Sequence, residues 1–146
     1  QRVFKSMTTL NKYACDVLKK YDVHALTDVT GFGLLVHLNE MLDDKNSAII
    51  YKDSIPYFDD CKRYVEEFYL SGAAQTNRNS VEGKIYFDCD FFTEEILFDP
   101  QTSGGLLASV SKEDLMDIKK NFIENNLELY VVGEVIDKNE YNVYVR

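Results

Sequence analysis

The strongest constraint on this fold is a polar, glycine-rich stretch, residues 27–35, with the sequence Thr-Asp-Val-Thr-Gly-Phe-Gly-Leu-Leu. It follows the apolar run Val23–Leu26 and leads into an amphipathic helical pattern that starts at Phe32. The change from a short apolar run to helical spacing predicts a strand that passes directly into a helix. A carboxylate, two hydroxyl groups and two glycines therefore lie at the junction of the two elements.

The residues of this junction have two interpretations. In the first, Asp28 supplies an oxygen ligand of the kind that Mg²⁺ takes beside substrate phosphates, and the helix N-terminus attracts the phosphate. Thr30 then caps the helix by accepting a bond from a free backbone N–H, while Gly31 and Gly33 allow a ligand or another chain segment to approach closely. In the second, the stretch is only a tight turn, with Asp28 bonded to local backbone.

A second polar, glycine-rich stretch, Asp99-Pro100-Gln101-Thr102-Ser103-Gly104-Gly105, runs into the apolar pattern of residues 106–110, and the element Thr76-Asn77-Arg78-Asn79 lies between the two stretches. In this order, the three closely resemble the C-terminal domain of selenophosphate synthetase (selenide, water dikinase). The resemblance covers essentially all 146 residues. The chain departs from the family at Val36, where a glycine is usual, and at 71–75, which replaces a glycine pair.

The resemblance implies an enzyme that makes selenophosphate from selenide, ATP and water and releases AMP and phosphate. In this family the N-terminal domain holds the glycine-rich segment, the catalytic Cys or selenocysteine with its Lys, and several metal-binding aspartates. None of these lies in this chain, so the resemblance implies no catalytic residue here. It does imply that Asp28 helps to hold Mg²⁺ against the nucleotide phosphates, across a cleft between the two domains. It also implies a homodimer of the full-length protein.

The second stretch has two interpretations under this resemblance. In one, Thr102, Ser103 and Gly104 line the interdomain cleft near the phosphates, as Thr30, Gly31 and Gly33 do on the first stretch. In the other, the second stretch is a rigid turn that docks one domain on the other.

Residues 1–146 are expected to form one domain, the C-terminal half of a longer two-domain enzyme, because the chain begins at Gln1 within a helical pattern. Such a fragment is expected to be inactive alone. Two alternatives stay open. One is another ATP-dependent enzyme of the same superfamily, such as aminoimidazole ribonucleotide synthetase or a hydrogenase-maturation or thiamine-phosphate kinase relative. The other is a non-catalytic binding module. The complete Asp-Pro-Gln-Thr-Ser-Gly-Gly string favours the selenium enzyme.

Composition argues against several classes of protein. The net charge of −9 and the pI near 4.7 disfavour nonspecific nucleic-acid binding, which relies on Lys and Arg. The same charge repels ATP, so an ATP site needs metal ions or basic residues from elsewhere. No phosphate-binding loop of the Gly-Lys-Ser/Thr type is present, and no apolar run approaches the ~20 residues of a membrane helix. Scattered cysteines, Cys15, Cys61 and Cys89, predict reduced thiols in a cytoplasmic protein, without a zinc site or disulfide framework.

Hydrophobic periodicity predicts an α+β domain, with one mixed sheet and helices packed on its faces. The expected strands are 23–27, 48–51, 84–92, 106–110, 127–136 and 141–145, with the last two forming a hairpin. The expected helices are 3–21, with its apolar residues in the core, 32–42, one that starts at Pro56, and one after Ser111 as cap. Residues 70–83 are predicted to be a surface loop.

Several polar residues have a structural and a functional interpretation. Arg78 is expected to form a structural ion pair in preference to a phosphate contact, and Asn79 to bond local backbone. Asp88 and Asp90 are expected on a solvated face of a strand. His24 and His37 are expected to have structural roles rather than catalytic ones.

Overall fold

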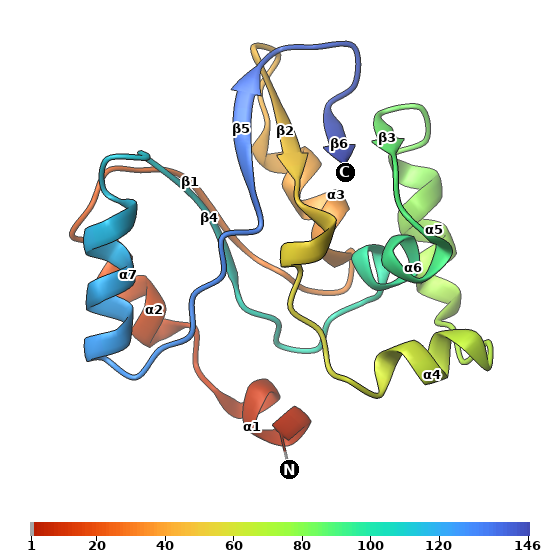
Figure 1. Ribbon diagram of the computed structural model, residues 1–146, viewed down its shortest axis with the longest axis horizontal. Helices are drawn as coiled ribbons and strands as arrows, with labels where there is room; N and C mark the ends of the chain where they lie inside the picture. The colour runs from red at the N-terminus through yellow and green to blue at the C-terminus, as the bar shows by residue number, and fades with distance from the viewer. Residues whose placement is uncertain (1) are drawn as a thin grey trace.

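The computed structural model describes residues 2–146, and its strands form two sheets (Figure 1). The smaller sheet pairs β1 (Val23–Asp28) with β4 (Leu106–Val110) in antiparallel fashion. The larger sheet has the order β3-β6-β2-β5, with β3 (Ile85–Phe87), β6 (Val143–Val145), β2 (Asn46–Ile50) and β5 (Gly133–Asp137). Because β2 is antiparallel to β5 and parallel to β6, this sheet is mixed. The predicted α+β class with a mixed sheet is therefore confirmed, but the strands divide between two sheets.

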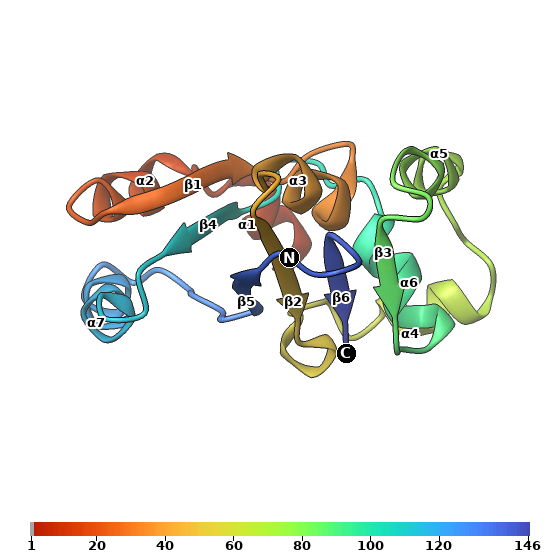
Figure 2. The same cartoon turned by 90° about the horizontal axis from the view of Figure 1, so that it is seen from above.

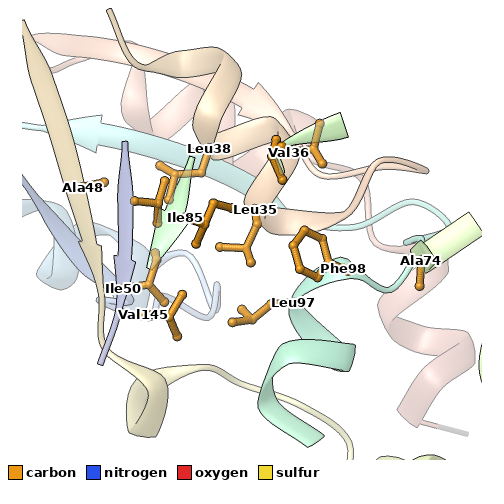
Figure 3. Close-up of a cluster of buried hydrophobic side chains, with 12 residues drawn as sticks. Leu35, Val36, Leu38, Ala48, Ile50, Ala74, Ile85, Leu97, Phe98 and Val145 are labelled. Carbon is orange, nitrogen blue, oxygen red and sulfur yellow. The ribbon is translucent and has the colours of Figure 1, made fainter. Parts of the chain in front are cut away.

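Each sheet has its own apolar core. Helices α2 (Lys12–Leu18) and α7 (Leu115–Glu124) pack with the smaller sheet, and Figure 2 shows this group on one side of the larger sheet. The main core lies against the larger sheet and the helices α3 (Gly33–Met41), α5 (Gly72–Ser80) and α6 (Phe91–Phe98). Figure 3 shows its side chains, which include Leu35, Leu97, Phe98, Ile50 and Val145.

The predicted hairpin of the last two strands is wrong, because β2 lies between β5 and β6. Residues 47–50 of β2 are all buried, and a strand of this kind is stabilised by partners on both edges. The connection from β5 to β6 crosses the start of β2 and is fixed by the buried hydroxyl of Ser47. That hydroxyl donates to the Tyr141 carbonyl oxygen at 2.7 Å and accepts from the Asn139 N–H at 3.0 Å. This crossing has no signal in the local sequence pattern.

The predicted helix of residues 3–21 is two helices, α1 (Arg2–Thr8) and α2. The hydroxyls of Thr8 and Thr9 donate back to carbonyl oxygens of the preceding turn, which favours an end to the helix there. The core-packing prediction fails for Val3, Met7 and Leu10, which are 49%, 42% and 60% exposed. It holds in α2, where Val17 and Leu18 are buried.

Residues 70–83 contain helix α5 rather than only a loop. Ser71 caps this helix by accepting a bond from the Ala73 N–H at 3.3 Å. Only two residues of this helix, Ala74 and Asn77, are buried. Its sequence is therefore mostly polar and lacks the apolar periodicity that would predict a helix. The predicted structural pair of Arg78 is confirmed, since its guanidinium pairs with the carboxylates of Glu94 and Glu95 on α6.

Other boundaries also differ from the sequence prediction, and the strand expected at 127–136 begins only at Gly133. The strand expected to reach residue 92 ends at Phe87, because Asp90 caps α6 by accepting from the Thr93 N–H at 2.9 Å. Helix α4 (Cys61–Glu66) begins after a short 3₁₀ turn, η1 (Lys52–Ser54), and an extended segment, so Pro56 does not start it. Helix α7 begins at Leu115 with no side-chain cap, because the Ser111 hydroxyl instead lies 3.3 Å from His24 Nε2.

None of the helices in residues 2–146 combines the length and the apolar character that a membrane crossing needs. Cys15, Cys61 and Cys89 are free thiols of intermediate burial. Burial, and after it the nearby carboxylates of Glu94 and Asp90, raise the pKa of Cys89 to about 11.

Candidate functional site

The two glycine-rich stretches lie side by side in the fold. The first is the loop between β1 and α3, and the second is the loop between α6 and β4. Asp28 and Leu106 are paired across the two strands, and the pairing continues into the loops. The Val29 N–H donates to the Gly105 carbonyl oxygen at 3.0 Å, and the Gln101 N–H donates to the Thr30 carbonyl oxygen at 3.0 Å. Two stretches separated by about seventy residues thus form one surface, the paired-loop site (residues 28–33 and 99–105).

Two glycines permit this close pairing. Gly33 has a φ of +74°, and a Cβ atom there would lie 2.8 Å from the Phe98 carbonyl oxygen. A Cβ atom at Gly104 would lie 2.3 Å from the Val29 carbonyl oxygen. The expected close approach at Gly33 is therefore present, but its neighbour is protein backbone. A Cβ atom at Gly31 would have no atom within 4 Å, so the fold itself does not require glycine at that position.

Asp28 is the last residue of β1, and its side chain is exposed. Among residues 2–146, no hydrogen bond or ion pair reaches its carboxylate, so the alternative of a side chain bonded to local backbone is not what the structure shows. The described residues also contain no group of three or more His, Cys, Asp or Glu side chains that could hold a metal ion. A single unpaired carboxylate fits Mg²⁺, which binds through one or two carboxylates and keeps its other positions for waters and phosphates.

Thr30 does not cap the helix, which corrects the sequence prediction. Phe32 is the N-cap residue and makes no side-chain cap, because the Gly33 N–H bonds to the backbone carbonyl oxygen of Thr30 at 3.0 Å. The Thr30 hydroxyl instead lies 3.1 Å from His37 Nε2. His37 is buried on α3, and its Nδ1 lies 3.4 Å from Glu40 Oε2. The expected structural role of His37 is consistent with these contacts.

The second loop presents two exposed hydroxyl side chains, Thr102 and Ser103. Ser103 has a φ of +54°, in the left-handed region that non-glycine residues rarely adopt. Within the described chain no hydrogen bond joins either hydroxyl to Asp28 or Thr30. A side chain from the N-terminal part of the chain also fixes this loop, because Asn11 Nδ2 donates to the Gly104 carbonyl oxygen at 2.9 Å.

Asp99 is the one residue of the second loop, 99–105, whose side chain ionises as an acid. Partial burial of its carboxyl group raises the pKa of Asp99 above the usual value, while a bond from Gln101 Nε2 at 3.2 Å opposes that rise. The paired-loop site therefore offers Asp28 as its exposed, unpaired carboxylate, with hydroxyls and backbone groups around it.

Sequence reasoning missed the residue that joins the site to the rest of the fold. Asn77 is 4% exposed, and its Nδ2 donates to the carbonyl oxygens of Gly31 and Phe98, each at 3.0 Å. It thereby bridges one loop to the end of α6, where the other loop begins. Arg78 supports the same corner, with its guanidinium 4.7 Å from the ring centroid of Phe98. The polar run 76–79 was the available signal, but no local pattern indicates that its first asparagine is buried.

The family model described as "AIR synthase related protein, C-terminal domain" matches residues 2–146. The chain therefore belongs to the family of AIR synthase-related C-terminal domains.

The chain is also similar to proteins named selenide, water dikinase. It is 44% identical over 142 residues to the one from Agathobacter rectalis, a match that covers 96% of this chain and 42% of that protein. It is 37% identical over 139 residues to the one from Desulfitobacterium hafniense, a match that covers 94% of this chain and 41% of that protein. It is also 37% identical to the one from Caldanaerobacter subterraneus subsp. tengcongensis, over 96% of this chain and 42% of that protein. The chain thus spans about two fifths of these relatives, and the resemblance inferred from the motifs is confirmed.

Proposed function

We propose that this chain is the C-terminal domain of an ATP-dependent selenophosphate synthetase, which converts selenide, ATP and water to selenophosphate, AMP and phosphate. The name shared by the similar proteins and the two motifs in their expected order support this proposal. Because the chain spans 41–42% of the relatives named above, the activity needs the remainder of such a protein. We expect residues 1–146 to be inactive alone and to act with an N-terminal domain, in a cytoplasmic homodimer.

The observation that carries the proposal is the exposed, unpaired carboxylate of Asp28 at the point where the two loops are bonded together. A carboxylate left without a protein partner among the described residues is available to a cation. Mg²⁺, when bound, neutralises charge on the phosphate oxygens and so favours phosphoryl transfer. This chain's own contribution is to hold Asp28 at a fixed place, through the strand pairing with Leu106 and the bonds between the loops.

Residues near Asp28 then contact the phosphates or the second domain. The hydroxyl of Thr30 and the exposed hydroxyls of Thr102 and Ser103 donate hydrogen bonds to anionic oxygens, which are among the stronger hydrogen bonds in proteins. The backbone at Gly31, Gly33 and Gly104 completes this surface. ATP is held mainly by the N-terminal domain, because the C-terminal domain formed by residues 1–146 is acidic and has no phosphate-binding loop of the Gly-Lys-Ser/Thr type.

The test replaces Asp28 in the full-length protein. Asp28→Ala and Asp28→Asn should lower selenide-dependent formation of AMP and phosphate by roughly 100-fold, since they remove a ligand from the cation that stabilises the transferred phosphoryl group. Asp137→Asn is the matched control, because Asp137 is also exposed at the end of a strand, β5, in the other sheet. Binding of Mn²⁺ with ATP, followed by electron paramagnetic resonance, should weaken in the Asp28 variants only. Unchanged turnover and unchanged Mn²⁺ binding in Asp28→Ala would remove Asp28 from the site.

A second candidate function is another ATP-dependent activity of the same family, because the matching family is named for AIR synthase. The same assay separates the two. ATP consumption that requires selenide supports selenophosphate synthesis, and consumption that proceeds equally without selenide supports the alternative.

A further inference from the structure

The buried imidazole of His37 contacts the backbone and the side chain of Thr30 through one nitrogen. His37 Nε2 lies 3.2 Å from the Thr30 backbone nitrogen and 3.1 Å from Thr30 Oγ1, and Nδ1 faces the Glu40 carboxylate at 3.4 Å. A backbone N–H can only donate, so Nε2 must accept. We assign the neutral tautomer with its hydrogen on Nδ1, the ring nitrogen that lies 3.4 Å from the Glu40 carboxylate.

In this tautomer, the hydrogen of the Thr30 hydroxyl is not required to bond to His37. Nε2 has a single lone pair, and the Thr30 N–H and O–H are two donors that compete for it. The hydroxyl has no other bond within the described chain. The Thr30 carbonyl oxygen is already occupied, because it accepts from the N–H groups of Gly33 and Gln101, each at 3.0 Å. The residue is therefore fixed at its backbone and has one donor hydrogen that is free to turn toward a ligand.

We propose that His37 is a positioning residue, which holds Thr30 so that its hydroxyl donates to a phosphate oxygen of the bound nucleotide, while Glu40 fixes the ring tautomer. The inference rests on the proposed function, because it needs the phosphates to lie beside Asp28. The link to Asp28 is short, since Thr30 is two residues further along the same loop and Val29 between them is bonded to Gly105. Phe32 packs at the imidazole, with the ring centroids 5.8 Å apart, and helps to hold its orientation.

The first experiment reads the tautomer directly. Full-length protein labelled with ¹⁵N-histidine is studied by long-range ¹H–¹⁵N correlation spectroscopy, and the His37 signals are assigned by their loss in His37→Leu. A protonated Nδ1 and a hydrogen-bonded, unprotonated Nε2 are expected. The opposite tautomer would overturn the inference, whatever reaction the enzyme catalyses.

The second experiment measures the dissociation constant of ATP with Mg²⁺ by calorimetry, without selenide. Thr30→Val and His37→Leu should each weaken binding roughly tenfold, as expected for one lost hydrogen bond to a charged oxygen. Thr30→Ser and His37→Gln should bind within about threefold of the wild-type protein, because a hydroxyl or an acceptor for the Thr30 N–H remains. His24→Leu is the matched control, since His24 is exposed and its Nε2 contacts only Ser111 and Asp22 in the described chain.

The outcomes separate the two proposals. Weaker ATP binding in Thr30→Val and His37→Leu, with recovery in Thr30→Ser and His37→Gln, supports the role of His37. Unchanged ATP binding in Thr30→Val, or no binding of ATP by the wild-type protein, would overturn it. An absence of selenide-dependent turnover in a protein that binds ATP in this way would instead contradict the proposed reaction and leave the role of His37 supported.

Discussion

The side-chain amide of Asn77 on α5 donates to the carbonyl oxygen of Gly31, in the loop that follows Asp28, at 3.0 Å. The same Nδ2 also donates to Phe98, at the end of α6, at 3.0 Å. One buried amide therefore bonds to two backbone carbonyl groups, one in the first loop and one at the end of α6, where the second loop begins. Because buried carbonyl groups without partners are costly, this residue couples the stability of the fold to the geometry of the loops.

Replacement of Asn77 should therefore destabilise the protein. Asn77→Ala removes both donors and leaves a cavity, and we expect a loss of about 2–3 kcal/mol in the free energy of unfolding, measured by urea denaturation. Asn79→Ala is the matched control on the same helix, because Asn79 is exposed and its side chain, among residues 2–146, only accepts a bond from Gln75 Nε2 at 2.8 Å. We expect less than about 0.5 kcal/mol for this control. Equal effects of the two variants would contradict the assigned role of Asn77.

The two glycines of the first loop should differ in their tolerance of a methyl group. Gly33→Ala places a Cβ atom 2.8 Å from a backbone oxygen at a φ of +74°, and we expect a loss of roughly 2–4 kcal/mol in the free energy of unfolding. Gly31→Ala meets no atom within 4 Å and should change that free energy by less than about 1 kcal/mol. Thermal and urea denaturation of both variants measure the difference. If Gly31→Ala nevertheless lowers activity, the space beside Gly31 is used by a ligand or the second domain.

Removal of Arg78 should destabilise the protein far more than removal of one partner of an exposed ion pair. The guanidinium of Arg78 and the carboxylates of Glu94 and Glu95 are 26%, 26% and 12% exposed at their side chains. Arg78→Leu leaves two largely buried carboxylates without a cation, and we expect a loss of roughly 2–3 kcal/mol in the free energy of unfolding. Arg2→Leu is the control, because the Arg2–Asp59 pair is 78% and 91% exposed and should contribute at most about 0.5 kcal/mol. The triple variant with Glu94→Gln and Glu95→Gln should recover part of the loss.

The thiol of Cys89 should be unreactive near neutral pH. Its pKa of about 11, raised first by burial, lies above the ~8.5 of a free cysteine, so the thiolate fraction at pH 8 is lower by roughly 100-fold. In a Cys15→Ser, Cys61→Ser variant, alkylation by iodoacetamide should be slow below pH 10 and should accelerate as the pH rises toward 11. The same variant unfolded in urea is the control and should react as a free thiol. Rapid alkylation of the folded variant at pH 8 would contradict this assignment.

The sequence predicted those elements whose signal is local. The strands at 23–27 and 106–110 and the helix after Phe32 agree with the structure to within one or two residues, because each has its own apolar periodicity. Predictions failed where the periodicity was weak or misleading. Helix α5 has a polar sequence with two buried residues, and the apolar residues of α1 continue a helical pattern although none of them is buried.

The motifs in the chain were enough to identify the family and to place a carboxylate at the end of the first strand. The way in which these parts meet became clear only from the fold. The position of β2 between β5 and β6, the bridge from Asn77 to the first loop and the end of α6, and the pairing of His37 with Thr30 depend on geometry that no periodic pattern encodes. The physical reason is that the bonds that join the site link segments far apart in the chain, and their formation depends on burial, which excludes water from the same donors and acceptors.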